Sequence, residues 1–427
     1  MDLFVIASIL IVLSAIFGYI NIRFLKLPNT IGLMVIAILF TIGLFLTSLI
    51  NNSLLQFAEQ LISEIDFKTV LLDVMLGFLL FAGAMHTNFD QLRVQQWPVI
   101  VFATVGVLTS TFLVGGLSYY VFNAMDFDVS FIHCLLFGAL ISPTDPIAVL
   151  GIMKKAGVPK ILETKIVGES LFNDGVGVVI FLTILSIATG GDGVHGGSSI
   201  SSVATLFGQE VIGGILFGAV LGWLTFRLMK SIDDYEIEVL ITLACVMGGY
   251  VFAHYLHLSA PLAIVVAGLI VGNDTVRDTS MSAVTEEFVD KFWELVDMLL
   301  NALLFVLIGL ELLVISFDMA YVTAGIISIV LVLLSRFLSL IIPVKIFAKK
   351  LDFLPNTATL MTWGGLRGGI SIALALSLPE DMNRDLFLTV TYVVVVFSII
   401  VQGLSIGKVA TKLLGADMMN ALSEDGH

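Results

Sequence analysis

Charged residues are scarce in this 427-residue chain: Asp, Glu, Lys and Arg make up 13% of it, whereas hydrophobic residues make up 58%. A soluble protein of this length would carry roughly twice that charged fraction. The mean hydropathy is also high, at +1.06. These values exclude an ordinary soluble enzyme and predict a chain that lies mostly in a lipid bilayer. Nothing in the composition suggests a nucleic-acid partner.

Cysteine and long polar stretches are equally rare. Cys134 and Cys245 both fall in apolar segments without metal-ligand spacing, so we expect them to be packing residues. The first apolar segment lacks a clear small-residue cleavage site and is expected to be a retained span. Residues 413–427 are expected to form a short cytoplasmic tail, and no soluble domain and no cofactor are expected. Function is therefore expected within the membrane.

Apolar segments long enough to cross a bilayer recur along the whole chain. Thirteen are predicted, at about 2–22, 30–50, 65–85, 97–122, 131–151, 162–190, 203–229, 234–256, 258–272, 287–315, 319–348, 355–378 and 384–412. Sixteen of the twenty Lys and Arg residues then fall on one side of the membrane, Lys68 and Arg384 fall on the other, and two lie within spans. Because cytoplasmic loops collect basic residues, the N-terminus is predicted outside and the C-terminus in the cytoplasm.

Two of these segments carry residues that interrupt a helix. Residues 142–146 read Ser-Pro-Thr-Asp-Pro, and the two prolines remove two backbone donors and leave carbonyl groups free. This motif alone is also compatible with a simple proline kink. Residues 364–369 read Gly-Gly-Leu-Arg-Gly-Gly, which places the charge of Arg367 inside a glycine-rich, apolar segment. Non-helical backbone at membrane depth survives only where protein buries it or where it lines a cavity, and the guanidinium needs a partner.

The two interrupted segments are the fifth and the twelfth, so they cross the membrane in opposite directions. This arrangement predicts an all-α polytopic membrane protein with an inverted repeat of two six-helix halves, in which the two broken helices cross near the bilayer midplane. Such a plan is typical of secondary transporters. Asp145 and Arg367 carry charges suited to neutralise the opposed half-helix dipoles. Asp145 is interpreted first as such a structural charge and second as a direct ion ligand.

The sixth segment is unusually polar, since residues 168–177 read Gly-Glu-Ser-Leu-Phe-Asn-Asp-Gly-Val-Gly. Ser170 and Asp174 share one helix face, and Glu169 and Asn173 share a second face about 100° away. Arg336 lies near the middle of the eleventh segment, too deep to extend easily to water. Pairing Glu169 with Arg336 neutralises both side chains and leaves Asp174 without a permanent counter-ion.

A proton and a hard cation compete for the oxygens of a desolvated carboxylate, because either one neutralises its charge. Oxygen ligands from Asp174, Ser170 and the backbone near Thr144 suit Na⁺ or Li⁺. If Asp174 binds one or the other, and only the loaded site crosses the membrane, the two ions exchange one for one without net charge movement. Asn173, an amide, supports a single exchangeable charge, although helix–helix hydrogen bonding is another role for it.

These motifs resemble those of the monovalent cation/proton antiporter family, in its electroneutral branch with an Asn-Asp motif. The resemblance rests on Thr-Asp-Pro at 144–146, Gly-Glu-Ser-x-x-Asn-Asp at 168–174, the mid-span Arg336 and Gly-Gly-Leu-Arg-Gly at 364–368, and it covers essentially all thirteen segments. It implies an NhaA-like antiporter fold and sodium/proton exchange. The implied site residues are Asp174 for cation and proton, Asn173 in support, Thr144 and Ser170 as oxygen donors, Glu169 paired with Arg336, and Asp145 with Arg367 at the crossing.

The resemblance also implies a homodimer in which a mobile core moves against a fixed scaffold. The scaffold helices are expected at 1–90 and 234–315, the ion-translocating core at 97–190 and 319–412, and a linking helix at 203–229. An elevator-like movement of the core would give alternating access. A bacterial inner membrane is the expected location, with a role in pH homeostasis.

One departure from the family pattern bears on ion selectivity. Many relatives carry an acidic residue in the third segment, where this chain reads Leu-Leu-Phe-Ala-Gly at 79–83, with Ala82 at the acidic position. The choice among Na⁺, Li⁺ and K⁺ therefore stays open, and a K⁺/H⁺ antiporter is an alternative. A channel and a sodium-coupled symporter for an organic anion are further alternatives. Replacing Asp174 by Asn discriminates between an antiporter, in which exchange should vanish, and a channel, which should keep some conductance.

Overall fold

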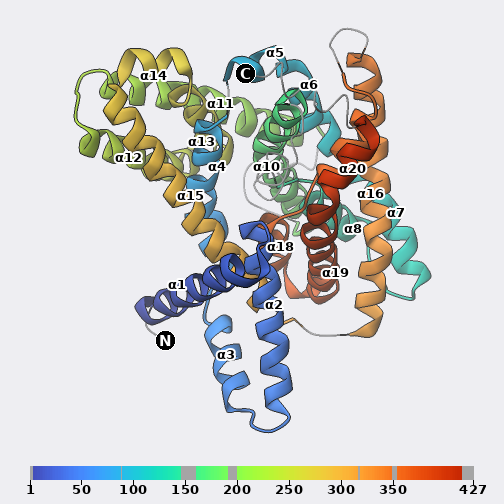
Figure 1. Cartoon of the computed structure of the whole chain (residues 1–427). Coiled ribbons are helices and arrows are strands. Elements are labelled where there is room, and N and C mark those ends of the chain that lie inside the picture. Colours follow the sequence, from blue (N-terminus) through green and yellow to red (C-terminus); the bar gives the residue numbers. More distant parts are fainter. Residues whose placement is uncertain are drawn as a thin grey trace.

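The computed structural model describes residues 3–87, 89–145, 160–190, 200–315, 318–348 and 353–415, and all secondary structure within them is helical. Pro146, the second proline of the predicted break, lies outside these residues. Figure 1 shows the course of the chain. The longer helices are α1 (Leu3–Ile20), α2 (Asn29–Ser48), α7 (Val107–Ala124), α10 (Lys160–Ala188), α11 (Ile200–Met229), α12 (Tyr235–Tyr255), α15 (Ala283–Glu311), α16 (Met319–Phe347) and α19 (Arg384–Phe397).

Shorter elements complete the helices or connect them. They are η1 (Asn21–Leu25), α3 (Ser53–Ser63), η2 (Thr69–Met75), α4 (Leu76–Met85), α5 (Phe89–Val94), α6 (Gln96–Val101), η3 (Phe102–Gly106), α8 (Phe131–Ile141), α13 (Ala260–Val271), α14 (Asp274–Ser280), α17 (Thr357–Gly364), α18 (Gly369–Leu376), η4 (Glu380–Met382), η5 (Ser398–Gln402) and α20 (Gly403–Leu414). The η1, η2, η3 and η5 elements are π-helical turns, and η4 is a 3₁₀ turn.

Nine helices of the described chain are long and apolar enough to cross a membrane. They are Phe4–Leu25, Asn29–Ser48, Gln96–Ala124, Leu162–Ala188, Phe207–Met229, Tyr235–Tyr255, Val284–Glu311, Met319–Phe347 and Arg384–Leu414. The prediction of an all-helical, multi-pass membrane protein is thereby confirmed. The other four predicted segments hold shorter helices: Thr69–Met85, α8, α13 and the pair α17 and α18. Thirteen crossings and the inverted repeat stay predictions.

Polar residues placed just before the apolar runs begin several of these helices. Asp234 accepts hydrogen bonds from the backbone N–H groups of Glu236 and Ile237 at the start of α12. Ser130 and Ser259 accept in the same way at the starts of α8 and α13. Such N-caps satisfy donors that the first turn of a helix leaves free, which matters more where water is scarce.

The helices form two groups that contact one another along α10, α13 and α18. Helices α12, α14 and α15 gather on the left of Figure 1, where α11, α13 and α4 pack with them. Helices α7, α16, α19 and α20 gather on the right, where α7 and α10 pack on α8. Helix α10 contacts α13 and α4, and α18 contacts η2 and α15. We call the first group, with α1, α2 and η2, the scaffold helices and the second, with α17 and α18, the core helices.

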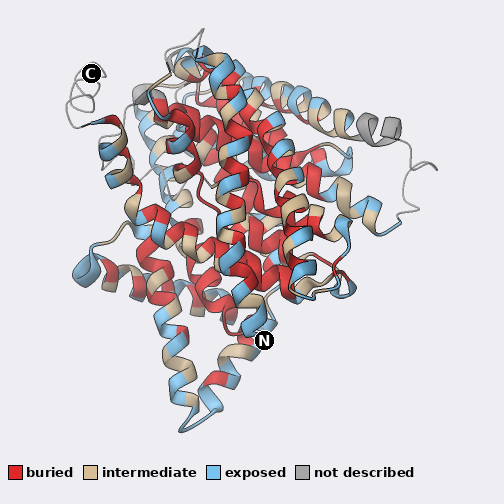
Figure 2. Ribbon diagram, turned by 90° about the vertical axis from the view of Figure 1, so that its right-hand side faces the viewer, coloured by how far each residue is buried: buried red, intermediate tan, exposed pale blue. Residues whose placement is uncertain are grey.

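Apolar packing is dense inside and apolar side chains also cover the outside. Buried residues run through the middle of the molecule in Figure 2, and exposed ones lie along the outer helices. Many exposed side chains are large and apolar, such as Phe4, Val251 and Val330. An apolar exterior of this kind would aggregate in water but suits contact with lipid. Cys134 and Cys245 are both buried among apolar neighbours.

Candidate functional site

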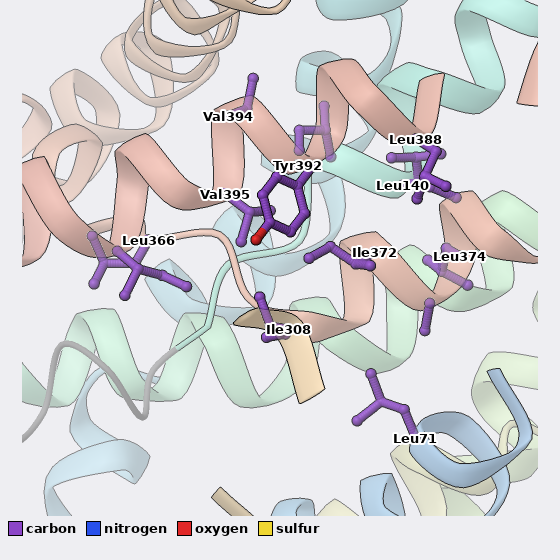
Figure 3. Packing of buried hydrophobic residues seen from close by; sticks show 14 of the residues in the cluster. Leu71, Leu140, Ile308, Leu366, Ile372, Leu374, Leu388, Tyr392, Val394 and Val395 are labelled. Carbon is purple, nitrogen blue, oxygen red and sulfur yellow. The ribbon is translucent and has the colours of Figure 1, made fainter. Parts of the chain in front are cut away.

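The two predicted breaks meet in the structure. Helix α8 ends at Ile141, α17 ends at Gly364, and the backbone N–H of Asp145 donates to the carbonyl oxygen of Leu366 at 2.7 Å. In Figure 3, Leu366 lies on the extended segment after α17, and Ile372 lies on α18, which follows that segment. A Cβ atom at Gly368 would collide with the carboxylate of Asp145. Glycine at this position therefore lets the two segments approach each other.

Arg367 stabilises the end of α8. Its Nη1 donates to the carbonyl oxygens of Ser142 and Pro143, the latter at 2.8 Å, and its backbone N–H donates to the hydroxyl of Ser398 at 2.9 Å. The carbonyl groups at the end of α8 have lost their helical partners, and the guanidinium replaces those partners. The carboxylate of Asp145 lies against Gly368, immediately before α18. Each charge thus lies at the half-helix end whose partial charge it opposes.

A buried hydrogen-bond cluster joins the first break to α10. The amide of Asn173 accepts from the backbone N–H of Thr144 at 3.2 Å and donates to the Thr144 hydroxyl at 2.8 Å. Ser170 donates to the carbonyl oxygen of Thr144, and the two hydroxyl oxygens lie 3.3 Å apart. Asn173 and Ser170 are fully buried. This cluster satisfies the irregular backbone at Thr144 with α10 side chains.

Glu169 and Arg336 form a bidentate ion pair in the core helices. Nη1 of Arg336 lies 2.5 Å from Oε1 of Glu169, and Nη2 donates to Oε2 at 2.7 Å. Each residue is only 1% exposed. Breaking a pair buried to this degree would leave an uncompensated charge in a medium where charge is costly.

Asp174 differs from the other buried charges. It is 4% exposed, and within the part of the chain that the structure describes its carboxylate makes no hydrogen bond and no ion pair. It lines a cavity between the scaffold and core helices, together with Leu71, Leu76, Leu79, Leu80, Gly83, Pro143, Thr144, Asp145, Leu171, Leu304, Gly368, Gly369, Ile370 and Ser371. Eleven of these fourteen residues are apolar or glycine, and the polar ones are Thr144, Asp145 and Ser371, so Asp174 faces a largely apolar space.

The structure places the predicted site residues in different surroundings. Asp174, Thr144 and Asp145 line the cavity. Ser170 and Asn173 do not line it and contact Thr144 instead. Glu169 and Arg336 form a separate pair, and Arg367 binds carbonyl groups. No group of three His, Cys, Asp or Glu side chains among the described residues is arranged to hold a metal ion.

Ser371 is a cavity residue that sequence reasoning missed. It follows Arg367 by four residues and is the first polar side chain of α18. Its position directly after the second break is the signal that points to it.

Ala82 does not line the cavity. It is 1% exposed and packs in a cluster of scaffold residues with Phe81 and Trp293. The scaffold side of the cavity consists instead of leucines and Gly83. No carboxylate among the described scaffold residues lines the cavity opposite Asp174.

Known proteins resemble this chain in sequence and in fold. Residues 11–412 match the family described as "Sodium/hydrogen exchanger, transmembrane". The Na⁺/H⁺ antiporter NhaP of Pseudomonas aeruginosa is 49% identical over 422 residues, which cover 98% of each chain. The Na⁺/H⁺ antiporter NhaH of Halobacillus dabanensis is 35% identical over 92% of this chain and 93% of its own. The solved structure of the sodium proton antiporter MjNhaP1 from Methanocaldococcus jannaschii has a similar fold, with a TM-score of 0.74 and 21% identity over 97% of this chain and 100% of its own.

Proposed function

The chain belongs to the sodium/hydrogen exchanger family, and we propose that it exchanges one Na⁺ or Li⁺ for one proton at Asp174. It is a multi-pass membrane transporter and not an enzyme. The unpaired carboxylate of Asp174 in the cavity is the observation that carries the proposal. The other charged side chains around the two breaks have partners, so Asp174 is the group whose charge a bound ion changes.

The exchange follows from the cost of charge in an apolar cavity. An empty, ionised Asp174 facing leucines is unfavourable, because a desolvated carboxylate loses its hydration without gaining a partner. Either a proton or a cation removes the penalty, and both ions compete for the same oxygens. Only the loaded site then has a low barrier to reorientation, which couples the two ions obligatorily.

Electroneutrality follows from the balance of the neighbouring charges. Glu169 and Arg336 form an ion pair, and Asp145 and Arg367, which lie at two different half-helix ends, add one charge of each sign, so their sum does not change during the cycle. Asp174 carries no net charge whether a proton or a monovalent cation occupies it. The loaded site is therefore neutral in both directions of transport.

The position of the cavity supports an elevator-like mechanism. The polar groups on its surface come from α10 and from the broken helices of the core, whereas η2, α4 and α15 of the scaffold present leucines and Gly83. If the core moves against the scaffold, the ion ligands move with it and the apolar surface seals the site behind them. We further propose a homodimer in a bacterial plasma membrane, with the N-terminus outside and the C-terminus inside.

Liposomes with an internal pH dye test the function. A proton gradient is imposed, Na⁺, Li⁺ or K⁺ is added outside, and the membrane voltage is clamped to zero. We expect a Na⁺- or Li⁺-dependent pH change in the wild type, its loss in Asp174→Asn, and its retention in Asp73→Asn, which alters an exposed carboxylate of η2.

Several results would contradict the proposal. Full exchange in Asp174→Asn would exclude Asp174 as the ion site. A pH change that requires a free membrane voltage would exclude the one-for-one stoichiometry, and conductance without coupling would indicate a channel. A response to K⁺ alone would establish the K⁺/H⁺ alternative.

A further inference from the structure

Ser371 is a buried hydroxyl on the surface of the Asp174 cavity. The residue is 1% exposed and lies in the first turn of α18, directly after the second break. Its hydroxyl makes no hydrogen bond to any residue that the structure describes. A buried polar group without a partner is costly. Ser371 differs from the other unpartnered buried hydroxyls, such as Ser328 and Ser335, because it lines the Asp174 cavity, where a bound ion can supply the partner.

The position of Ser371 in the helix explains why it has no partner in the chain. Some buried serines donate to a carbonyl of the preceding turn, as Ser142 does to Gly138 at 2.7 Å and Ser339 does to Arg336 at 2.8 Å. The hydroxyls of Ser14, Ser118, Ser328 and Ser335 are instead buried in helices without a partner among the described residues. Ser371 is the third residue of α18, and the residues three and four before it belong to the break. No preceding helical turn therefore exists to accept its hydrogen bond.

The other oxygen atoms near Asp174 each make a hydrogen bond within the chain. The Thr144 hydroxyl accepts from Asn173, and the carbonyl oxygens of Ser142 and Pro143 accept from Arg367. The hydroxyl of Ser170 donates to the Thr144 carbonyl and does not line the cavity. Among the described residues that line the cavity, Ser371 thus offers a neutral side-chain oxygen with no hydrogen bond inside the chain, opposite the leucines of the scaffold.

We propose that the Ser371 hydroxyl oxygen is a ligand of the transported cation, completing an oxygen shell with Asp174. A monovalent cation that enters the cavity loses hydration oxygens, and protein oxygens must replace them. A proton on Asp174 needs no such shell. Ser371 therefore contributes to cation binding and not to proton binding. This inference rests on the proposed exchange at Asp174.

Ser371→Ala tests the inference by removing one oxygen from the cavity. We expect the KM for Na⁺ to rise by roughly 3- to 10-fold, the effect of one lost oxygen contact. Vmax should stay close to that of the wild type. The ratio of the variant KM to the wild-type KM should be the same at every pH, because proton binding to Asp174 is unchanged. Ser377→Ala is the matched control, since the Ser377 hydroxyl donates to Leu374 at the other end of α18 and does not line the cavity.

Ser371→Cys gives a second measurement that needs no transport. A soft thiol is a poor ligand for Na⁺ but reacts with thiol reagents from the cavity. We expect labelling of this variant, partial protection by Li⁺ or Na⁺ bound at Asp174, and no protection when Asp174→Asn is added. The wild type measures background from Cys134 and Cys245, which are both buried.

The outcomes separate this inference from the proposed function. If the wild type exchanges Na⁺ for protons and Asp174→Asn does not, an unchanged KM in Ser371→Ala overturns the role of Ser371 alone. Equal labelling of Ser371→Cys with and without Na⁺ does the same. If the wild type shows no cation-dependent proton movement, both the function and the inference fail.

Discussion

At the scale of single residues, the buried charges divide by whether they have a fixed partner. Glu169 and Arg336 hold each other through two short contacts, and Arg367 is fixed by carbonyl groups. Asp174 lies five residues after Glu169, about one and a half turns along the same helix, but faces the cavity. The fixed groups are matched to one another, which supports the proposal that the ion exchanges at Asp174.

Glu169→Gln tests the structural role of the buried pair. The change leaves the Arg336 guanidinium uncompensated, so we expect a loss of about 3–5 kcal/mol in the free energy of unfolding. Thermal unfolding in detergent measures the loss. Lys291→Gln is the control, because its ion pair with Glu287 is 63% and 66% exposed and should not affect stability measurably.

The double variant Glu169→Gln, Arg336→Gln sharpens this test. The double variant no longer contains the uncompensated guanidinium of Arg336, so its free energy of unfolding should be higher than that of Glu169→Gln alone. Simple addition of the two single losses would show that the two side chains act independently.

Asn173→Ala tests the hydrogen-bond cluster at the first break. The change removes both contacts to Thr144 and leaves its backbone N–H buried without an acceptor. We expect a loss of about 1–3 kcal/mol in unfolding free energy and a lower rate of exchange. Gln56→Ala, on the exposed surface of α3, should change neither quantity. A stable, fully active Asn173→Ala would exclude the supporting role.

At the scale of elements, glycine decides how closely the core helices approach. A Cβ at Gly115 of α7 would lie 3.0 Å from Cα of Leu135 and 3.1 Å from the carbonyl oxygen of Cys134 on α8, whereas one at Gly116 would meet nothing within 4 Å. The two adjacent glycines thus have different roles. One permits the contact between α7 and α8, and the other faces open space.

Alanine at each glycine should therefore have opposite effects. Gly115→Ala forces α7 and α8 apart and should cost about 1–3 kcal/mol of stability. Gly116→Ala removes the helix penalty of glycine and should be neutral or stabilising by up to about 1 kcal/mol. Unfolding temperatures of the two purified variants measure the difference. Equal temperatures would argue against close packing of α7 on α8.

At the scale of the whole molecule, the proposed movement requires the core to slide past the scaffold. Helix α10 of the core contacts α13 of the scaffold, where a Cβ at Gly175 would lie 2.7 Å from Cγ and 3.2 Å from the backbone nitrogen of Leu262. The absence of a side chain at Gly175 thus allows α10 and α13 to approach closely. A side chain here would clash with Leu262 as the core moves past the scaffold.

Gly175→Ala tests that movement. We expect Vmax to fall by about fivefold, the effect of about 1 kcal/mol on a barrier, with a smaller change in KM. Gly248→Ala on α12, where an added Cβ meets nothing within 4 Å, should leave Vmax unchanged. An unaltered Vmax in a folded Gly175→Ala protein would argue against sliding along this interface.

Several features of the chain were determined by the sequence itself, because they depend on local chemistry. Apolar runs predict the membrane helices. Because charged residues are few, those that fall inside the apolar segments can be identified as side chains that need partners. Proline at 143 and the glycines at 364–369 predict interrupted helices, since neither residue type continues a helix well. The local sequence is enough for these conclusions, and they require no knowledge of long-range contacts.

Only the tertiary structure decided which groups face one another. The direction of a side chain around its helix axis depends on packing against other helices, which lie far away in sequence. Packing turns Ser170 toward Thr144, opens Ser371 to the cavity and buries Ala82 among scaffold residues. It also leaves Asp174 without an ion pair in a largely apolar cavity, because the partners of Glu169 and Arg367 come from α16 and from the end of α8.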